Sequence, residues 1–241
     1  MNDLLIENRD GLLAITLNRA QKANALSLAM NERLADALRK AGTDDAVRGI
    51  LIIGAGERAF SGGVDTRETS TLPEAQFRRQ RSATFFAVLL ALVDCEKPVV
   101  AAVNGAASGG GMMIAALADF VVAADHATFS LPEIDLGSPP LAALAILTPQ
   151  FGGALAYDLV QTARKLGAAE ALQRGLVRSV VPQAQLAASA EQLARELMSK
   201  NARAFARGKR WVREGLRAAL EKAEHEMVVY RSHPAAGDSK L

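Results

Sequence analysis

Two glycine-rich segments constrain the fold of this chain more than any other feature of its sequence. They are Ala-Phe-Ser-Gly-Gly-Val-Asp at 59–65 and Gly-Ala-Ala-Ser-Gly-Gly-Gly at 105–111, and each follows an apolar run that predicts a strand, at 49–53 and at 98–103. A glycine-rich turn at a strand end can point free backbone N–H groups into a cleft. Two such turns could donate one N–H each to a single developing oxyanion, which predicts chemistry on a carbonyl group.

The size and composition of the chain indicate a globular fold with a large core. Half of its 241 residues are hydrophobic, enough for one large domain or one domain with an appendage. The 28 basic and 26 acidic residues leave a net charge of +2, which argues against a nucleic-acid-binding protein. Six basic residues crowd one C-terminal stretch and indicate either the solvated face of a helix or a site for an anionic ligand or an acidic partner: Arg203, Arg207, Lys209, Arg210, Arg213 and Arg217.

Targeting, redox and metal-binding signals are sparse. No apolar run approaches the roughly 18 residues of a membrane span, and we expect neither a signal peptide nor a membrane partner. The single cysteine, Cys95, excludes an internal disulfide and is expected in the core. The terminal Ser-Lys-Leu can be a peroxisomal address, but the Ala- and Arg-rich composition favours a cytoplasmic bacterial protein. The three histidines lack metal-ligand spacing, so we expect no metal site: His126, His225 and His233.

The hydrophobic pattern predicts a mixed α/β fold of stacked repeating units rather than one open sheet. Strands are expected at 4–7, 12–17, 47–53, 98–103, 120–124 and 128–130, and helices at 28–41, 73–93 and 112–118. From Leu141 onward the pattern is mostly helical, apart from a run at 176–181. Three helices without a further strand are expected after Pro182, at 184–198, 202–220 and 221–230. No linker precedes them, which argues against independent domains.

Four motifs along the chain form a specific pattern: 17–19 with 22–26, 59–65, 104–111 and 129–134. In this order and spacing they resemble the crotonase superfamily, also called the enoyl-CoA hydratase/isomerase family, through nearly the whole chain. The resemblance implies a crotonase-type spiral of ββα units over residues 1–182, which would hold the acyl-CoA site. It also implies a C-terminal helical region over residues 183–241 for packing and oligomerisation, and a homotrimer or hexamer.

The resemblance further implies an acyl-CoA thioester as substrate, with coenzyme A as part of the substrate rather than a separate cofactor. The backbone N–H groups of Val64 and Gly110 would then hold the thioester oxygen while an enolate forms. Gly110 opens a predicted helix, so its N–H also gains from the helix dipole. The residues expected to contact the CoA substrate are Arg19, Lys22, Ala23, Ala25, Leu26, Ser61, Gly63, Val64, Asp65, Gly109, Gly110 and Lys209, with Arg210 as an alternative cation.

Glu133 is the strongest candidate for proton transfer. It lies between Pro132 and Ile134, and burial would raise the pKa of its carboxyl group toward neutral, which suits a general base. Family hydratases carry a second glutamate two residues after the third glycine, where this chain has Met113. Because a thioether carries no proton, the sequence favours an isomerase in which Glu133 alone moves a proton through a dienolate. The alternatives are a hydratase or thioester hydrolase using Glu133 alone, or a non-catalytic acyl-CoA-binding subunit.

The other acidic residues have weaker cases for proton transfer. Asp65 follows the first glycine-rich turn and favours anchoring or capping, whereas Glu68 could reach the cleft from a loop. Asp119 and Asp125 flank the strand at 120–124 and are expected to be structural. The segment 138–143 contains two prolines where the family often has glycines, and we expect this stiffened loop to border the acyl pocket.

Overall fold

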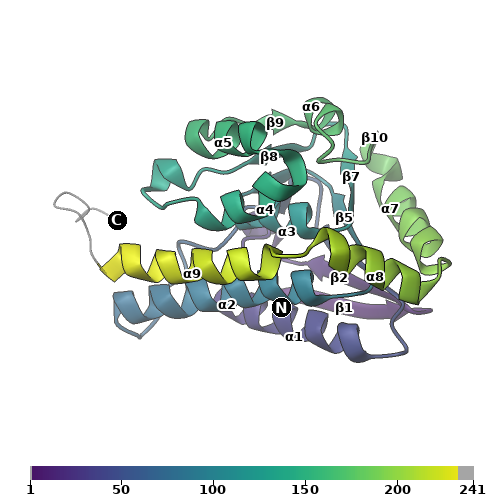
Figure 1. Cartoon of the computed structure of the whole chain (residues 1–241), viewed down its shortest axis with the longest axis horizontal. Coiled ribbons are helices and arrows are strands. Elements are labelled where there is room, and N and C mark those ends of the chain that lie inside the picture. The colour runs from purple at the N-terminus through teal and green to yellow at the C-terminus, as the bar shows by residue number, and fades with distance from the viewer. Residues whose placement is uncertain (1, 233–241) are drawn as a thin grey trace.

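Residues 2–232, which the computed structural model describes, fold around two β-sheets flanked by helices (Figure 1). The larger sheet has the order β1-β2-β3-β5-β7-β10, with strands at Leu4–Arg9, Leu12–Leu17, Gly49–Gly54, Val99–Val103, Phe120–Ala124 and Ser179–Val181. The smaller sheet has the order β4-β6-β8-β9, with strands at Ala59–Ser61, Ala106–Ser108, Thr128–Ser130 and Leu166–Gly167. The expectations about the terminal Ser-Lys-Leu and His233 concern residues outside this described part.

The expected repeating units are present. Three times in succession a strand of the larger sheet leads into a strand of the smaller sheet and then into a helix, as β3-β4-α2, β5-β6-α3 and β7-β8-α4. The helices of these units are Glu74–Asp94, Gly110–Leu117 and Leu141–Phe151. Successive units pair in parallel in both sheets, so Ala101 lies opposite Val121 in the larger sheet and Ala107 opposite Phe129 in the smaller one. This parallel stacking brings the ends of β4, β6 and β8 together.

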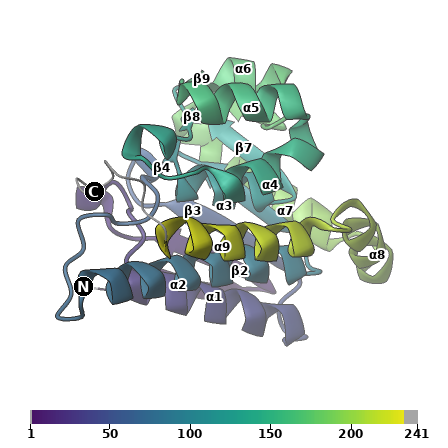
Figure 2. The same ribbon diagram turned by 60° about the vertical axis from the view of Figure 1, so that its left-hand side comes forward.

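The remaining helices cover the sheets. Their bounds are Leu28–Thr43 (α1), Gly153–Thr162 (α5), Ala168–Gln173 (α6), Gln183–Met198 (α7), Ala202–Val212 (α8) and Leu216–Ser232 (α9), with short 3-10 turns at Ala20–Lys22 (η1) and Ile134–Leu136 (η2). Helix α7 packs on β3, β5 and β7, while α9 runs along α2 and α4 in both views (Figure 2). One hydrophobic core holds Leu186 of α7 and Leu220 of α9 together with the strand residues. The C-terminal helices therefore share the core of the sheets.

The expected hairpin, helices and long strands are confirmed, but three features differ, one of which is the short strand β9 in a part of the chain that is expected to be helical. The glycine-rich segments begin with the short strands β4 and β6, which the glycine content concealed. The break among the C-terminal helices lies at residues 213–215 and not between Leu220 and Glu221, because Gly215 has a φ of +81°, which a helix cannot accommodate. Within residues 2–232 no helix combines the length and the apolarity that a membrane crossing requires.

A buried ion cluster ties the junction of α8 and α9 to the sheet. The Asp119 carboxylate accepts from Lys209 Nζ at 2.7 Å and from the Arg213 guanidinium at 3.2 Å. Each cation also donates to a backbone carbonyl, Lys209 to Lys97 and Arg213 to Leu92. All three charged side chains are about nine-tenths buried or more. Burial lowers the pKa of Lys209 and of Arg213, and the Asp119 charge opposes that shift in both.

Candidate active site

The two glycine-rich segments lie side by side at the ends of β4 and β6. Gly63 has a φ of +86°, and a Cβ on it would fall 2.7 Å from the Ser108 carbonyl oxygen and 3.0 Å from the Gly110 nitrogen. A Cβ on Gly111 would fall 2.3 Å from the Ser61 carbonyl oxygen. Only glycine fits such a close approach of two backbones. The glycines therefore serve to bring the backbone around Val64 against the start of α3.

The backbone N–H groups of Val64 and Gly110 have no hydrogen-bond acceptor in residues 2–232. Three of their neighbours are fixed: Gly63 donates to the Ser61 hydroxyl, Asp65 donates to the Leu26 carbonyl, and Gly109 donates to the Ser130 carbonyl. Gly110 is the first residue of α3, where an N–H has no partner inside the helix. Unused donors, among them the N–H groups of Val64 and Gly110, thus remain on two adjacent backbones.

Glu133 lies next to these donors. It follows β8 at the start of η2, and its carbonyl accepts from the N–H groups of Leu136 and Ser138, which holds the turn. A Cβ on Gly109 would fall 3.1 Å from Glu133 Oε1, so the carboxyl group lies directly against the second glycine-rich segment. The other oxygen, Oε2, is buried without a hydrogen-bond partner in the described residues. Burial raises the pKa of Glu133 to about 7, as the apolar sequence context predicts.

The other acidic side chains considered from the sequence are engaged elsewhere. Asp65 is buried and pairs with Arg19 at 3.0 Å. Glu68, which the sequence left as a candidate for the cleft, accepts at 2.9 Å from the Leu28 N–H at the start of α1. Asp119 holds the buried cations described above, and Asp125 pairs with His126 at 3.3 Å. Within the described residues, Glu133 alone of these candidates has a buried carboxylate oxygen without a hydrogen-bond partner.

Met113 lies one helical turn beyond Gly110 in α3. Its backbone N–H donates to the Gly109 carbonyl at 3.0 Å, and its side chain is buried in the hydrophobic core. The position that carries the second glutamate of family hydratases is therefore apolar and packed here.

Comparison with known proteins identifies the family. A model of the family described as enoyl-CoA hydratase/isomerase matches residues 7–239. The chain belongs to this family. It is 40% identical over 202 residues to the carnitinyl-CoA dehydratase of Salmonella arizonae, covering 82% of this chain and 76% of that protein. It is 37% identical over 227 residues to the carnitinyl-CoA dehydratase of Escherichia coli K12, covering 92% and 85%.

Solved structures of enoyl-CoA hydratases share the fold of this family member. An enoyl-CoA hydratase from Mycobacterium avium subsp. paratuberculosis K-10 superposes with a TM-score of 0.85 at 30% identity, covering 96% of this chain and 89% of that chain. The enoyl-CoA hydratase from Bacillus anthracis superposes with a TM-score of 0.83 at 30% identity, covering 95% and 92%. The fold expected from the sequence is confirmed.

In this enoyl-CoA hydratase/isomerase family member, the loop at residues 22–26 (the early loop) is hydrogen-bonded to the first glycine-rich segment, residues 59–65. The Gly62 N–H donates to the Ala23 carbonyl, and the Ser61 hydroxyl donates to the Asn24 carbonyl. Leu26 forms a parallel bridge with Val64. Residues 22–26 and the segment 59–65 thus form one surface beside the Val64 N–H, as the motif order predicts.

Of the three cations expected to meet CoA, the structure leaves one exposed. Arg19 is buried, and its guanidinium binds Asp65 and the Ala25 carbonyl, so it holds the early loop in shape. Lys209 is a correction to the sequence prediction, because its ammonium is buried against Asp119 and cannot reach a phosphate. Lys22 remains exposed at the end of η1. Arg210, the alternative cation, pairs with Glu96 at 3.1 Å on the outside of α8.

Two side chains close to the Val64 and Gly110 donors belong to none of the four sequence motifs. The Phe85 ring of α2 covers Gly110, since a Cβ on that glycine would fall 2.7 Å from the ring. Arg81, one turn earlier on α2, donates to the Asp65 carbonyl at 3.2 Å. Arg81 and Phe85 are four residues apart and therefore lie on one face of α2. This spacing is the feature of the sequence that could have indicated both residues.

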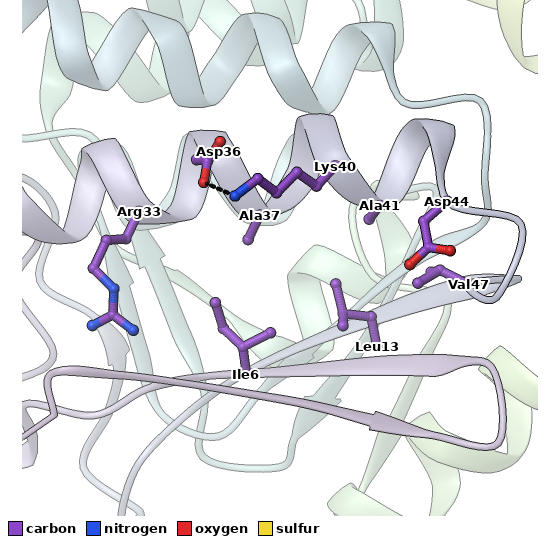
Figure 3. Close-up of a pocket in the computed structure, with 9 residues that line it drawn as sticks. All are labelled: Ile6, Leu13, Arg33, Asp36, Ala37, Lys40, Ala41, Asp44 and Val47. Atoms are coloured by element: carbon purple, nitrogen blue, oxygen red, sulfur yellow. Dashed lines mark ion pairs between the residues drawn. The ribbon is translucent and has the colours of Figure 1, made fainter.

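A pocket elsewhere on the molecule differs in character from this site (Figure 3). It lies between α1 and the β1–β2 hairpin and encloses about 260 Å³. Ile6 and Leu13 contribute to its apolar floor, and an ion pair of 2.8 Å between Asp36 and Lys40 lies on the α1 side. It shares no lining residue with the site around Glu133.

We expect Gly63→Ala to lower turnover by about 10²-fold, because the added Cβ must push the Val64 and Gly110 donors apart. The matched control is Gly175→Ala, which has a similar φ of +79° but open space around the added Cβ. The positive φ costs each variant roughly 1–2 kcal/mol, so thermal unfolding should shift similarly from this cause. Equal activity of the two variants would contradict a role of the close backbone approach.

Proposed function

We propose that this chain is an enoyl-CoA isomerase that stabilises a thioester enolate and shifts a carbon–carbon double bond. The observation that carries the proposal is Glu133, whose unpartnered Oε2 lies in a buried site beside two unused backbone donors. The packed thioether of Met113 supports a single-carboxylate mechanism.

In the proposed reaction the thioester oxygen accepts hydrogen bonds from the N–H groups of Val64 and Gly110. Glu133, as a carboxylate, removes a proton from the α carbon of a 3-enoyl chain, and the electrons move into a dienolate held by the two donors. The protonated Glu133 then returns the proton to the γ carbon, which leaves a conjugated 2-enoyl thioester. The enzyme recovers its carboxylate, and no water is gained or lost. A pKa near 7 lets one group act as both base and acid.

We further propose that the CoA part of the substrate lies along the surface formed by residues 22–26 and 59–65. The backbone of Ala23 and Ala25 would face the adenine and the pantetheine, with Lys22 as the exposed cation beside them. Arg19 and Asp65 support this surface from below through their buried ion pair.

A second candidate is a hydratase or dehydratase. The relatives named carnitinyl-CoA dehydratase and the structural neighbours named enoyl-CoA hydratase favour it. In this chain such a reaction would require Glu133 both to activate water and to handle the α proton, since Met113 can do neither.

Incubation with a 3-enoyl-CoA and, separately, with a 2-enoyl-CoA distinguishes these functions. We expect the 3-enoyl substrate to gain the absorbance of a conjugated thioester without a change in mass. Addition of one water to the 2-enoyl substrate at a higher rate would overturn the isomerase in favour of the hydratase. Binding of both compounds without any reaction would overturn both and indicate an acyl-CoA-binding subunit.

A further inference from the structure

Helix α2 carries three side chains in one stripe beside the Val64 and Gly110 donors. Phe77, Arg81 and Phe85 are spaced four residues apart, so they lie along one face of the helix. Both phenylalanines are buried and the arginine between them is half-buried. This face of α2 therefore packs against the protein and not toward solvent.

Arg81 holds the backbone that follows the Val64 donor. Its Nη1 donates at 3.2 Å to the Asp65 carbonyl, and its guanidinium lies over the Phe77 ring at 5.5 Å. The Asp65 N–H donates at 2.9 Å to the Leu26 carbonyl. The N–H and the carbonyl of the residue after the donor are thus both held, the first by the strand bridge of the early loop and the second by α2.

The hydrogen bond from Arg81 is the stronger of two that reach the Asp65 carbonyl. In residues 2–232 the other donor to this carbonyl is the Glu68 N–H, at 3.4 Å. A charged donor at 3.2 Å binds a partly buried carbonyl more strongly than a neutral donor at 3.4 Å. The Glu68 bond also closes a turn within the same loop, so it moves with the loop. Arg81 is therefore the contact that ties this carbonyl to a helix.

Phe85 has the matching position at the Gly110 donor. A Cβ on Gly110 would fall 2.7 Å from the tip of the Phe85 ring, so the ring lies directly against this backbone. Helix α2 packs on α3, which begins at Gly110. Because Arg81 and Phe85 are about one helical turn apart, a single rigid element contacts the backbone beside both donors. The placement of the two donors relative to each other therefore depends on α2.

We propose that Arg81 and Phe85 are positioning residues. Through the backbone they set the distance and the direction of the Val64 and Gly110 N–H groups toward the thioester oxygen, and neither side chain contacts the reacting atoms. The inference rests on the proposed acyl-CoA function and extends its site from the glycine-rich segments to α2.

Arg81→Met tests the first contact, because it keeps a long apolar side chain over Phe77 but has no hydrogen-bond donor. We expect kcat for 3-hexenoyl-CoA to fall about tenfold with KM within about twofold, since a displaced donor costs less than the 10²–10³-fold of a donor that is lost. Arg81→Lys keeps a cationic donor and should recover most of kcat. Arg79→Gln, on the exposed side of the same turn, should keep the kcat of the wild type.

Phe85→Leu tests the second contact, because the smaller side chain leaves Gly110 without the ring. We expect kcat to fall by about threefold or more, again with little change in KM. The matched control is Phe86→Leu, which removes the same atoms from the neighbouring buried phenylalanine. Both variants should lower the unfolding temperature, but Phe86→Leu should keep its kcat. Equal kcat values for the two variants would overturn the role of Phe85.

A measurement without turnover separates this inference from the proposed reaction. Hexanoyl-CoA, labelled with ¹³C at the thioester carbonyl, has no double bond to move. Hydrogen bonds to the carbonyl oxygen lower its stretching frequency, which infrared difference spectroscopy detects on binding. We expect a full shift with the wild type and Arg79→Gln, and a smaller shift with Arg81→Met and Phe85→Leu, even where no enoyl substrate reacts.

Two spectroscopic outcomes contradict the inference in different ways. The same shift in the wild type, Arg81→Met and Phe85→Leu would overturn the positioning role alone, and any loss of kcat in these variants would then be structural. A wild type that binds hexanoyl-CoA without any shift would overturn the Val64 and Gly110 donors themselves, and with them both the proposed function and this inference.

Discussion

Glu133→Gln is expected to lower turnover of the 3-enoyl substrate by about 10²–10⁴-fold, the usual contribution of a positioned general base. The amide has nearly the shape of the carboxyl group but cannot take a proton from carbon. Binding of the substrate should change little, because the proposed Val64 and Gly110 donors are untouched. The control is Asp135→Asn, which removes an exposed carboxylate two residues further along the same turn. Undiminished turnover by Glu133→Gln would exclude the single-carboxylate mechanism.

The pH dependence of kcat/KM provides a second test of Glu133. Because the base must be ionised, kcat/KM of the wild type should rise with pH and level off above about 7, the raised pKa of Glu133. Any residual activity of Glu133→Gln should lack this rise. A flat wild-type profile between about pH 5 and pH 8 would show that Glu133 does not carry the proton.

The raised pKa of Glu133 also determines how the stability of the protein changes with pH. Folding raises the pKa of Glu133 from 4.5 to about 7, so the folded state holds the proton more tightly than the unfolded state. The contribution of Glu133 to stability is therefore lost as pH rises from about 4.5 to about 7. Glu133→Gln removes this loss, and at pH 8 we expect it to unfold at a temperature equal to or above that of the wild type. A lower unfolding temperature would indicate a structural cause for lost turnover.

Asp119→Ala is expected to destabilise the protein by about 3–5 kcal/mol, because it leaves two buried cations without their carboxylate. The variant also removes the acceptor of the Val99 N–H at the start of β5. Urea unfolding at equilibrium measures the difference. A buried cation without its carboxylate has neither an ionic partner nor water around it. The free-energy cost of Asp119→Ala should therefore far exceed the cost of removing an ion pair at the surface.

The matched control is Asp94→Ala. Asp94 pairs with Arg217 of α9, but both side chains are about half exposed, so its loss should cost about 1 kcal/mol or less. A cost of Asp119→Ala no larger than that of Asp94→Ala would mean that water reaches the cluster and that it does not anchor the C-terminal helices.

Local signals in the sequence were sufficient for the secondary structure and for the core of the site. Hydrophobic periodicity predicts the long strands and helices because each face must meet the core. The glycines of 59–65 and 105–111 predict close backbone approach because only glycine tolerates it, and the structure places Gly63 against Gly110. The apolar residues on both sides of Glu133 predicted its burial and its raised pKa. All of these signals depend on neighbours in the chain.

The fate of the cations was decided by the tertiary structure. From the sequence, Lys209 and Arg19 are expected to contact CoA phosphates because both are basic. In the structure each lies buried against an aspartate, and in one of these pairs Lys209 and Asp119 are 90 residues apart in the chain. Arg81 belongs to no motif, yet its guanidinium donates to the Asp65 carbonyl, one residue beyond the Val64 donor. A charge is either neutralised by a partner or available to a ligand, and this depends on what the fold places within a few ångströms of it, which no local pattern encodes.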